Sequence, residues 1–165
     1  MDRTKLKTLG DLKKSKYISK SIKDEIRQNL IKSLKNQEDL YEGILGFDNT
    51  VMPDLERSLL SKHNILLLGL RGQAKTKIAR LTTQLLDEWV PAIADSELNE
   101  DPFNPLTQKS IDLIQAQGDK TEIKWIHRDD RYVEKLATPD VSIADLIGDV
   151  DPIKAATLKL PYSDP

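Results

Sequence analysis

Apolar residues recur at helical spacing in several parts of the chain. The clearest repeat predicts an amphipathic helix from Ser21 to about Asn36, with apolar residues at Ile22, Ile26, Leu30, Ile31 and Leu34. A second helix is expected from Pro53 to about Lys62, because proline suits a first helical turn. A third is expected from Lys75 to about Val90, with Trp89 on its apolar side and Pro91 as its stop.

Short apolar or alternating runs predict the strands. Ile65 to Leu68 is a continuous apolar run stopped by Gly69, which is typical of a strand buried on both faces of a parallel sheet. The segments Glu122 to Ile126 and Arg131 to Ala137 alternate as strands do. Val141 to Gly148 is expected to form a short helix closed by its glycine.

The composition is that of a soluble globular protein, with 38% hydrophobic and 32% charged residues. No apolar run is long enough to cross a bilayer, so no membrane association is expected. Cysteine is absent, which excludes disulfides, thiolate metal sites and a cysteine nucleophile and fits a cytoplasmic location.

The charge is uneven along the chain. Residues 1–35 hold 11 Lys and Arg against 4 Asp and Glu, whereas residues 36–165 hold 14 against 23. The basic residues at the front are scattered and accompanied only by Tyr17 as an aromatic, so nucleic acid is not expected as a partner.

Gly69 to Thr76, with the sequence GLRGQAKT, fits the phosphate-loop pattern except that Ala74 replaces the usual second glycine. Gly69 and Gly72 permit a tight loop whose backbone N–H groups turn onto phosphate. Lys75 would reach the β- and γ-phosphates, and the Thr76 hydroxyl would ligate Mg²⁺. The candidate nucleotide-binding residues here are Gly69, Gly72, Gln73, Ala74, Lys75, Thr76 and Lys77.

The loop is similar to the G-x-P-G-x-A-K-[ST] loop of MoxR-type AAA+ ATPases, relatives of the ATPase subunit of magnesium chelatase. Ala74 is the familiar form there, whereas Arg71 stands in place of the usual proline. A second segment resembles the family's T-P-D-x4-D-[IL]-x-G pattern, with agreement at Thr138, Pro139, Asp140, Asp145 and Gly148. No catalytic role is assigned to either aspartate, since turn formation and capping are their commoner uses.

A third segment, Ile44 to Asp48, looks like the stretch before the first core helix whose backbone holds adenine in AAA+ proteins. The resemblance therefore makes Ile44 and Leu45 candidate adenine contacts and favours ATP as the nucleotide. Core packing explains an apolar pair before a glycine equally well. No guanine-selecting N-K-x-D string is present, and the second motif argues against a small kinase or GTPase.

The resemblance covers roughly residues 38–90 and 131–153. It implies an α/β fold, a P-loop NTPase (AAA+) core with a parallel sheet flanked by helices, incomplete at the C-terminus. Residues 1–37 would then be a basic, helical lead-in, loosely ordered over its first 20 residues. Residues 38–165 would be the partial ATPase core, with a surface insertion at about 91–130.

The function implied is that of the ATP-binding part of an AAA+ ATPase, with ATP and Mg²⁺ as cofactors. Its full form would be a homo-oligomeric ring, expected to be a hexamer, that couples ATP hydrolysis to remodelling or maturation of a partner protein complex. No apolar strand ending in acidic residues follows Gly148, so no catalytic residue is identified and the chain alone is expected not to hydrolyse ATP. The alternative is a non-hydrolysing nucleotide-binding or protein-interaction module.

Overall fold

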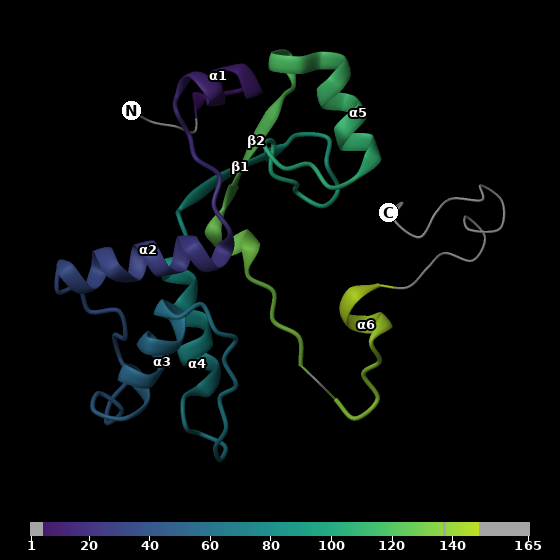
Figure 1. Ribbon diagram of the computed structural model, residues 1–165. Helices are drawn as coiled ribbons and strands as arrows, with labels where there is room; N and C mark the ends of the chain where they lie inside the picture. Colours follow the sequence, from purple (N-terminus) through teal and green to yellow (C-terminus); the bar gives the residue numbers. More distant parts are fainter. Residues whose placement is uncertain (1–4, 137, 149–165) are drawn as a thin grey trace. The chain divides into compact units, whose positions relative to one another are not determined.

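The computed structural model describes residues 5–136 and 138–148 (Figure 1). Its contacts divide the chain into two compact units. Unit 1 contains the described parts of Met1–Tyr17, Pro91–Lys124 and Tyr132–Pro165, and unit 2 contains Ile18–Val90 and Trp125–Arg131.

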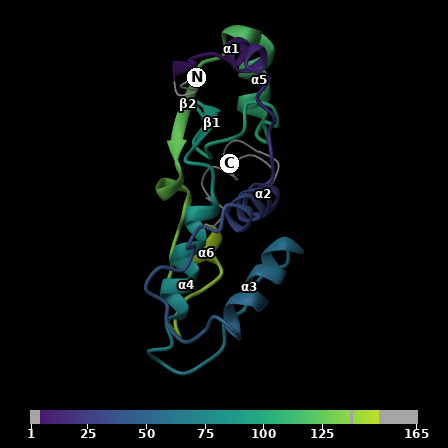
Figure 2. The same cartoon turned by 90° about the vertical axis from the view of Figure 1, so that its left-hand side faces the viewer.

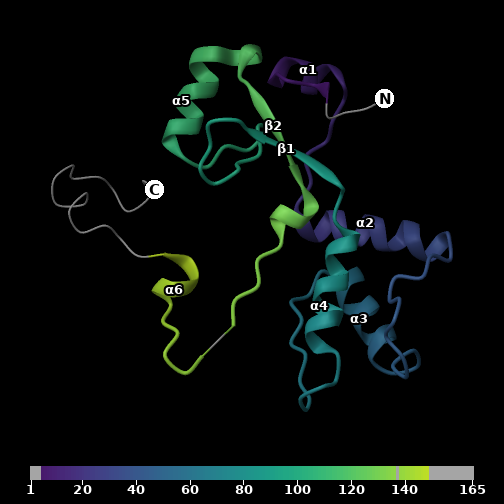
Figure 3. The same ribbon diagram turned by 180° about the vertical axis from the view of Figure 1, so that it is seen from behind.

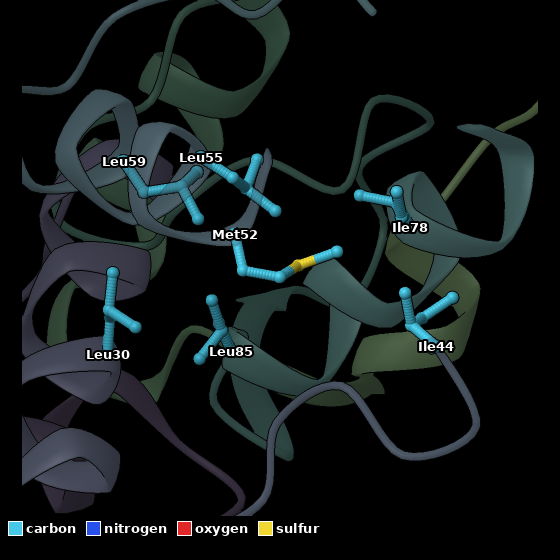
Figure 4. Packing of buried hydrophobic residues seen from close by; sticks show 7 residues of the cluster. All are labelled: Leu30, Ile44, Met52, Leu55, Leu59, Ile78 and Leu85. Carbon is cyan, nitrogen blue, oxygen red and sulfur yellow. The ribbon is translucent and has the colours of Figure 1, made fainter. Parts of the chain in front are cut away.

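Unit 2 is built on helices that pack around a small apolar core. The helices are α2 (Ile22–Lys35), α3 (Val51–Leu60), α4 (Lys75–Leu81) and the 3-10 turn η2 (Thr82–Leu85). The core, shown in Figure 4, consists of Leu30, Ile44, Met52, Leu55, Leu59, Ile78 and Leu85. The helices expected from Ser21 and from Pro53 are therefore confirmed, and Ser21 caps α2 by accepting the N–H of Asp24 at 3.2 Å.

The helix predicted from Lys75 to about Val90 is longer than the helix that the structure shows there. The α-helix ends at Leu81, η2 ends at Leu85, and Trp89 begins the strand β1 (Trp89–Ile93). The Thr82 and Thr83 hydroxyls donate to the carbonyls of Ala79 and Arg80 at 2.6 and 2.7 Å. Such back-bonding competes with the regular helical ladder, which accounts for the 3-10 geometry and the early end.

A buried ion pair lies in unit 2. Glu25 is 2% exposed, and its carboxylate accepts hydrogen bonds from both terminal nitrogens of Arg131 at 2.7 Å. It also accepts the N–H of Asp87 at 2.5 Å. The pair thereby joins α2 to the chain after η2 and to the 3-10 turn η4 (Arg128–Arg131).

The apolar run from Ile65 to Leu68 was predicted to be a buried strand, and this prediction is wrong. Residues 63–70 have no regular secondary structure, as the connection between α3 and α4 in Figure 2 shows. Leu67 packs on the core, but Leu66 and Leu68 are 80% and 82% exposed. A strand needs a neighbour to satisfy its backbone groups and cover its faces, and the described residues supply none here.

The described residues contain one sheet, in which β1 pairs with β2 (Ile123–His127). Ala94 N–H donates to Glu122 O and Arg128 N–H donates to Glu88 O, so the two strands run in opposite directions. Figures 1 and 3 show them side by side. The strand expected at Glu122 to Ile126 is confirmed, whereas the larger parallel sheet remains a prediction.

Unit 1 contains α1 (Leu9–Lys14), α5 (Gln108–Gln117) and the 3-10 turn η3 (Gly118–Lys120). The first twenty residues were expected to be loosely ordered, yet Leu9 and Leu12 are buried and Leu9 N–H donates to Thr121 O at 2.9 Å. Ala92 and Ile93, in the segment expected as a surface insertion, are also fully buried.

The last described part of the chain carries a single helical turn, α6 (Ala144–Ile147). A helix closed by Gly148 is confirmed, because Gly148 has φ 84° and donates its N–H to Ala144 O at 2.8 Å. It begins at Ala144, three residues later than the predicted start at Val141. The strand expected at Arg131 to Ala137 is not found over Tyr132 to Leu136, and residue 137 lies outside the described residues. None of the helices in the described ranges is both long and apolar enough to cross a membrane.

Candidate phosphate-binding loop

The loop before α4 takes left-handed backbone conformations at the positions that its motif marks. Gly69, Gly72 and Ala74 have φ of 154°, 81° and 54°. Only glycine adopts such conformations without steric cost, and a residue with a Cβ pays about 1–2 kcal/mol. The position where most phosphate loops carry glycine thus keeps its left-handed conformation here, although alanine occupies it.

Lys75 is the first residue of α4, and its side chain turns back over the loop. Its Nζ donates to Gly69 O at 2.9 Å and to Leu70 O at 2.5 Å. An ammonium group has three N–H donors, so two hold it against the loop and the third is not used by these contacts. Thr76 follows in the exposed first turn of the helix.

Lys77 connects this helix to the segment proposed to hold adenine. Its Nζ donates to Gly43 O at 2.8 Å. A Cβ at Gly43 would lie 2.5 Å from the same Nζ, so glycine leaves the room that the contact needs. Lys77 therefore uses its ammonium on the protein backbone and brings residue 43 beside the start of α4.

The two candidate adenine contacts differ in their surroundings. Ile44 is 7% exposed and belongs to the core cluster with Ile78 (Figure 4). Leu45 is 87% exposed. The Ile44 side chain is committed to the core, so a base beside this segment would meet its backbone and Leu45.

A pocket of about 330 Å³ lies next to the loop. It is bounded by α3, by residues 64–68 and by Gln73 and Lys75 of the loop. Its lining combines apolar side chains with polar ones, and both the Lys75 ammonium and the Asp54 carboxylate belong to it. A ligand held by the loop would therefore have both a positive group and apolar surface within reach.

The second motif, Thr138 to Gly148, belongs to unit 1. Asp145 accepts the N–H of Ser142 at 2.9 Å and its hydroxyl at 2.8 Å, and these bonds lower the pKa of the Asp145 carboxyl. The Thr138 hydroxyl bonded to Asp140 likewise lowers the pKa of that carboxyl. Asp145 thereby fixes the backbone before α6, as expected of a capping residue.

A metal ion at Thr76 would find few further protein ligands among the described residues. Within residues 5–136 and 138–148, no group of three or more His, Cys, Asp or Glu side chains could hold a metal ion. A cation at Thr76 would therefore depend on phosphate oxygens and water for its other ligands, as Mg²⁺ often does with nucleotides.

Two contacts of the loop were not anticipated from the sequence. Gln73 Oε1 accepts the N–H of Leu70 at 2.8 Å, and Lys77 binds Gly43 rather than standing clear for phosphate. Gln73 occupies a variable position of the motif, so its residue type alone carried no signal. The contact of Lys77 joins residues 34 positions apart and depends on the fold.

Comparison of the chain with protein-family models, with curated proteins and with solved structures found no match. The resemblance to MoxR-type ATPases accordingly rests on the sequence motifs.

Proposed function

We propose that Gly69 to Thr76 binds the phosphates of Mg²⁺-ATP and that the chain is the ATP-binding part of an AAA+ ATPase. The observation that carries the proposal is the Lys75 ammonium, held on Gly69 O and Leu70 O inside a loop with left-handed residues at its motif positions. This arrangement places a cation beside a tight turn before any ligand arrives. Anion binding then needs little rearrangement of the loop.

The backbone N–H groups, Lys75 and Thr76 have different roles in the proposed phosphate binding. Backbone N–H groups of the turn and of the first turn of α4 would donate to phosphate oxygens. Lys75 would neutralise charge on the β- and γ-phosphates with its remaining donor. Bound Mg²⁺ would bridge the phosphates and neutralise their charge, with the Thr76 hydroxyl among its ligands.

Exposed leucines beside the loop leave apolar surface uncovered in the described residues. Leu66, Leu68 and Leu70 alternate along the chain and are each at least 77% exposed, while Leu67 packs inward. The homo-oligomeric ring, the partner complex that it remodels and the cytoplasmic location are proposed from the resemblance and the composition.

Calorimetric titration tests nucleotide binding directly. We expect wild-type protein to bind Mg²⁺-ATP more tightly than Mg²⁺-GTP, and Lys75→Ala to bind at least about tenfold more weakly, since a charge-assisted contact contributes about 1.5–3 kcal/mol. The matched control is Lys109→Ala, which removes an exposed lysine of α5 outside the loop.

Two results would contradict the proposal. The first is absence of Mg²⁺-ATP binding by folded wild-type protein, which would favour a protein-interaction module. The second is an equal loss of affinity in Lys75→Ala and Lys109→Ala, which would show that binding does not occur at the loop.

A further inference from the structure

The Gln73 side chain spans the phosphate loop. Its Oε1 accepts the N–H of Leu70 at 2.8 Å and so closes the turn from Leu70 to Gln73. A Cβ at Gly69 would lie 2.2 Å from this Oε1 atom, so a larger residue at position 69 would displace the amide. Glycine at position 69 therefore serves a contact as well as a backbone conformation.

The residue that Gln73 holds is one that Lys75 also holds. Gln73 fixes the N–H of Leu70, and the Lys75 ammonium donates to the carbonyls of Leu70 and Gly69. The position of the ammonium thus depends on the position of this short backbone segment. Anything that releases the Leu70 N–H also loosens the support of the cation.

The rest of the turn offers little restraint of its own. Arg71 and Gly72 are exposed, and glycine at position 72 carries the largest backbone freedom of any residue type. A hydrogen bond across such a turn removes conformations that would otherwise have to be lost when phosphate binds. The Gln73 amide is suited to this task because its flexible side chain reaches across three residues.

We propose that Gln73 is a positioning residue, which orders the Gly69 and Leu70 backbone and thereby holds the Lys75 ammonium where phosphate is bound. The inference rests on the proposed ATP binding and adds a residue that acts through its neighbours. Gln73 itself does not have to touch the nucleotide.

The first experiment compares Gln73→Met with the wild type. Methionine has a similar length but lacks the amide acceptor, and Gln28→Met on the exposed face of α2 is the matched control. We expect the Kd for Mg²⁺-ATP to rise about three- to tenfold in Gln73→Met, in line with the loss of one hydrogen bond, and to stay unchanged in Gln28→Met. The thermal midpoint without nucleotide should not move, because the loop is exposed.

The second experiment measures the hydrogen bond itself, without nucleotide. Amide exchange at Leu70, followed by NMR, should become faster in Gln73→Met. It should stay slow in Gln73→Glu, which keeps an acceptor oxygen at the same reach. Exchange at Leu70 that is equally fast in all three proteins would overturn the inference.

The two proposals fail in different ways. Normal Mg²⁺-ATP affinity in Gln73→Met, together with loss of binding in Lys75→Ala, would remove the role of Gln73 and leave ATP binding intact. Absence of binding by wild-type protein would remove the proposed function and with it the positioning role, even if exchange at Leu70 remained slow.

Discussion

At the scale of single residues, the Glu100 carboxylate organises the loop before α5. It is 5% exposed and accepts the N–H groups of Leu106 and Thr107 at 2.7 and 2.6 Å. The hydroxyls of Ser96, Thr107 and Ser110 also donate to it. Burial alone would raise the pKa of Glu100, but the Ser110 hydroxyl, the Thr107 N–H and the other donors outweigh burial and lower it to about 2.

This shift predicts how stability depends on pH. The folded pKa lies below the unfolded one, so the contribution of Glu100 is complete above about pH 5 and is lost as the pH falls through the unfolded value near 4.5 toward 2. We expect Glu100→Gln to lower the free energy of unfolding by about 3 kcal/mol at pH 7, and by progressively less below pH 4.5. Urea denaturation followed by far-ultraviolet circular dichroism measures this difference.

Glu97→Gln is the control for the Glu100 experiment. Glu97 is exposed in the same loop and pairs with Lys109 across 3.6 Å, so its substitution should change stability by less than about 0.5 kcal/mol at any pH. A deficit in Glu100→Gln that is the same at pH 7 and pH 3 would show that the carboxylate charge is not what stabilises the loop.

The role of Glu100 could not be predicted from the sequence. Glutamate is common on surfaces, and nothing in the pattern around Glu100 distinguishes it from Glu97. Its role comes from donors at Ser96, Thr107 and Ser110, which a folded loop brings to one point. By contrast, the unusual backbone conformations of Gly69 and Gly72 could be predicted, because glycine adopts positive φ angles without steric cost.

At the scale of elements, the segment from residue 63 to residue 70 shows how much a strand depends on its neighbours. Its apolar run is typical of a buried strand, yet one side packs on the core through Leu67 and the other side is exposed. The alternation of burial is that of an extended chain with a single covered face.

Alanine substitutions along this segment should therefore differ in cost. Leu67→Ala is expected to destabilise unit 2 by about 1–2 kcal/mol, because it removes partly buried apolar surface. Leu66→Ala and Leu68→Ala should each change stability by less than about 0.5 kcal/mol. Thermal and urea unfolding of the three variants measure these values; if Leu66→Ala or Leu68→Ala proves as costly as Leu67→Ala, both faces are covered in solution.

Helices were more predictable than strands. Helices α2 and α3 satisfy most of their backbone groups internally, and the spacing of their apolar residues is a local signal, as is the Ser21 cap of α2. Two further expectations failed for local reasons. Helix α1 has only six residues, too few to show a repeat, and the threonines after α4 shorten the helix by binding its carbonyls.

At the scale of the whole molecule, nucleotide binding and nucleotide hydrolysis require different groups of the protein. In the proposed function the loop would supply a cation and turn N–H groups for phosphate, whereas hydrolysis also needs acidic residues that hold Mg²⁺ and polarise water. The sequence shows no apolar strand followed by such residues after Gly148. The proposed function therefore predicts that the chain binds Mg²⁺-ATP without turning it over.

Phosphate release measures that expectation. The purified chain should release phosphate from Mg²⁺-ATP no faster than Lys75→Ala, which provides the background from any contaminating enzyme. Release by the wild type that Lys75→Ala abolishes would show that the chain carries a complete hydrolytic site and would overturn the view of it as a partial ATPase core.

The sequence by itself determined the positions of α2 and α3, the strand β2 and the left-handed conformations of Gly69 and Gly72. Each of these follows from local backbone demands or from a repeat within one segment. Only the tertiary structure decided that Leu66 and Leu68 are exposed, that Lys77 holds Gly43 and that Glu100 is buried among donors. Those features depend on which distant segments meet, and side-chain patterns along a chain record the preference of a residue for burial or hydrogen bonding without specifying its partner.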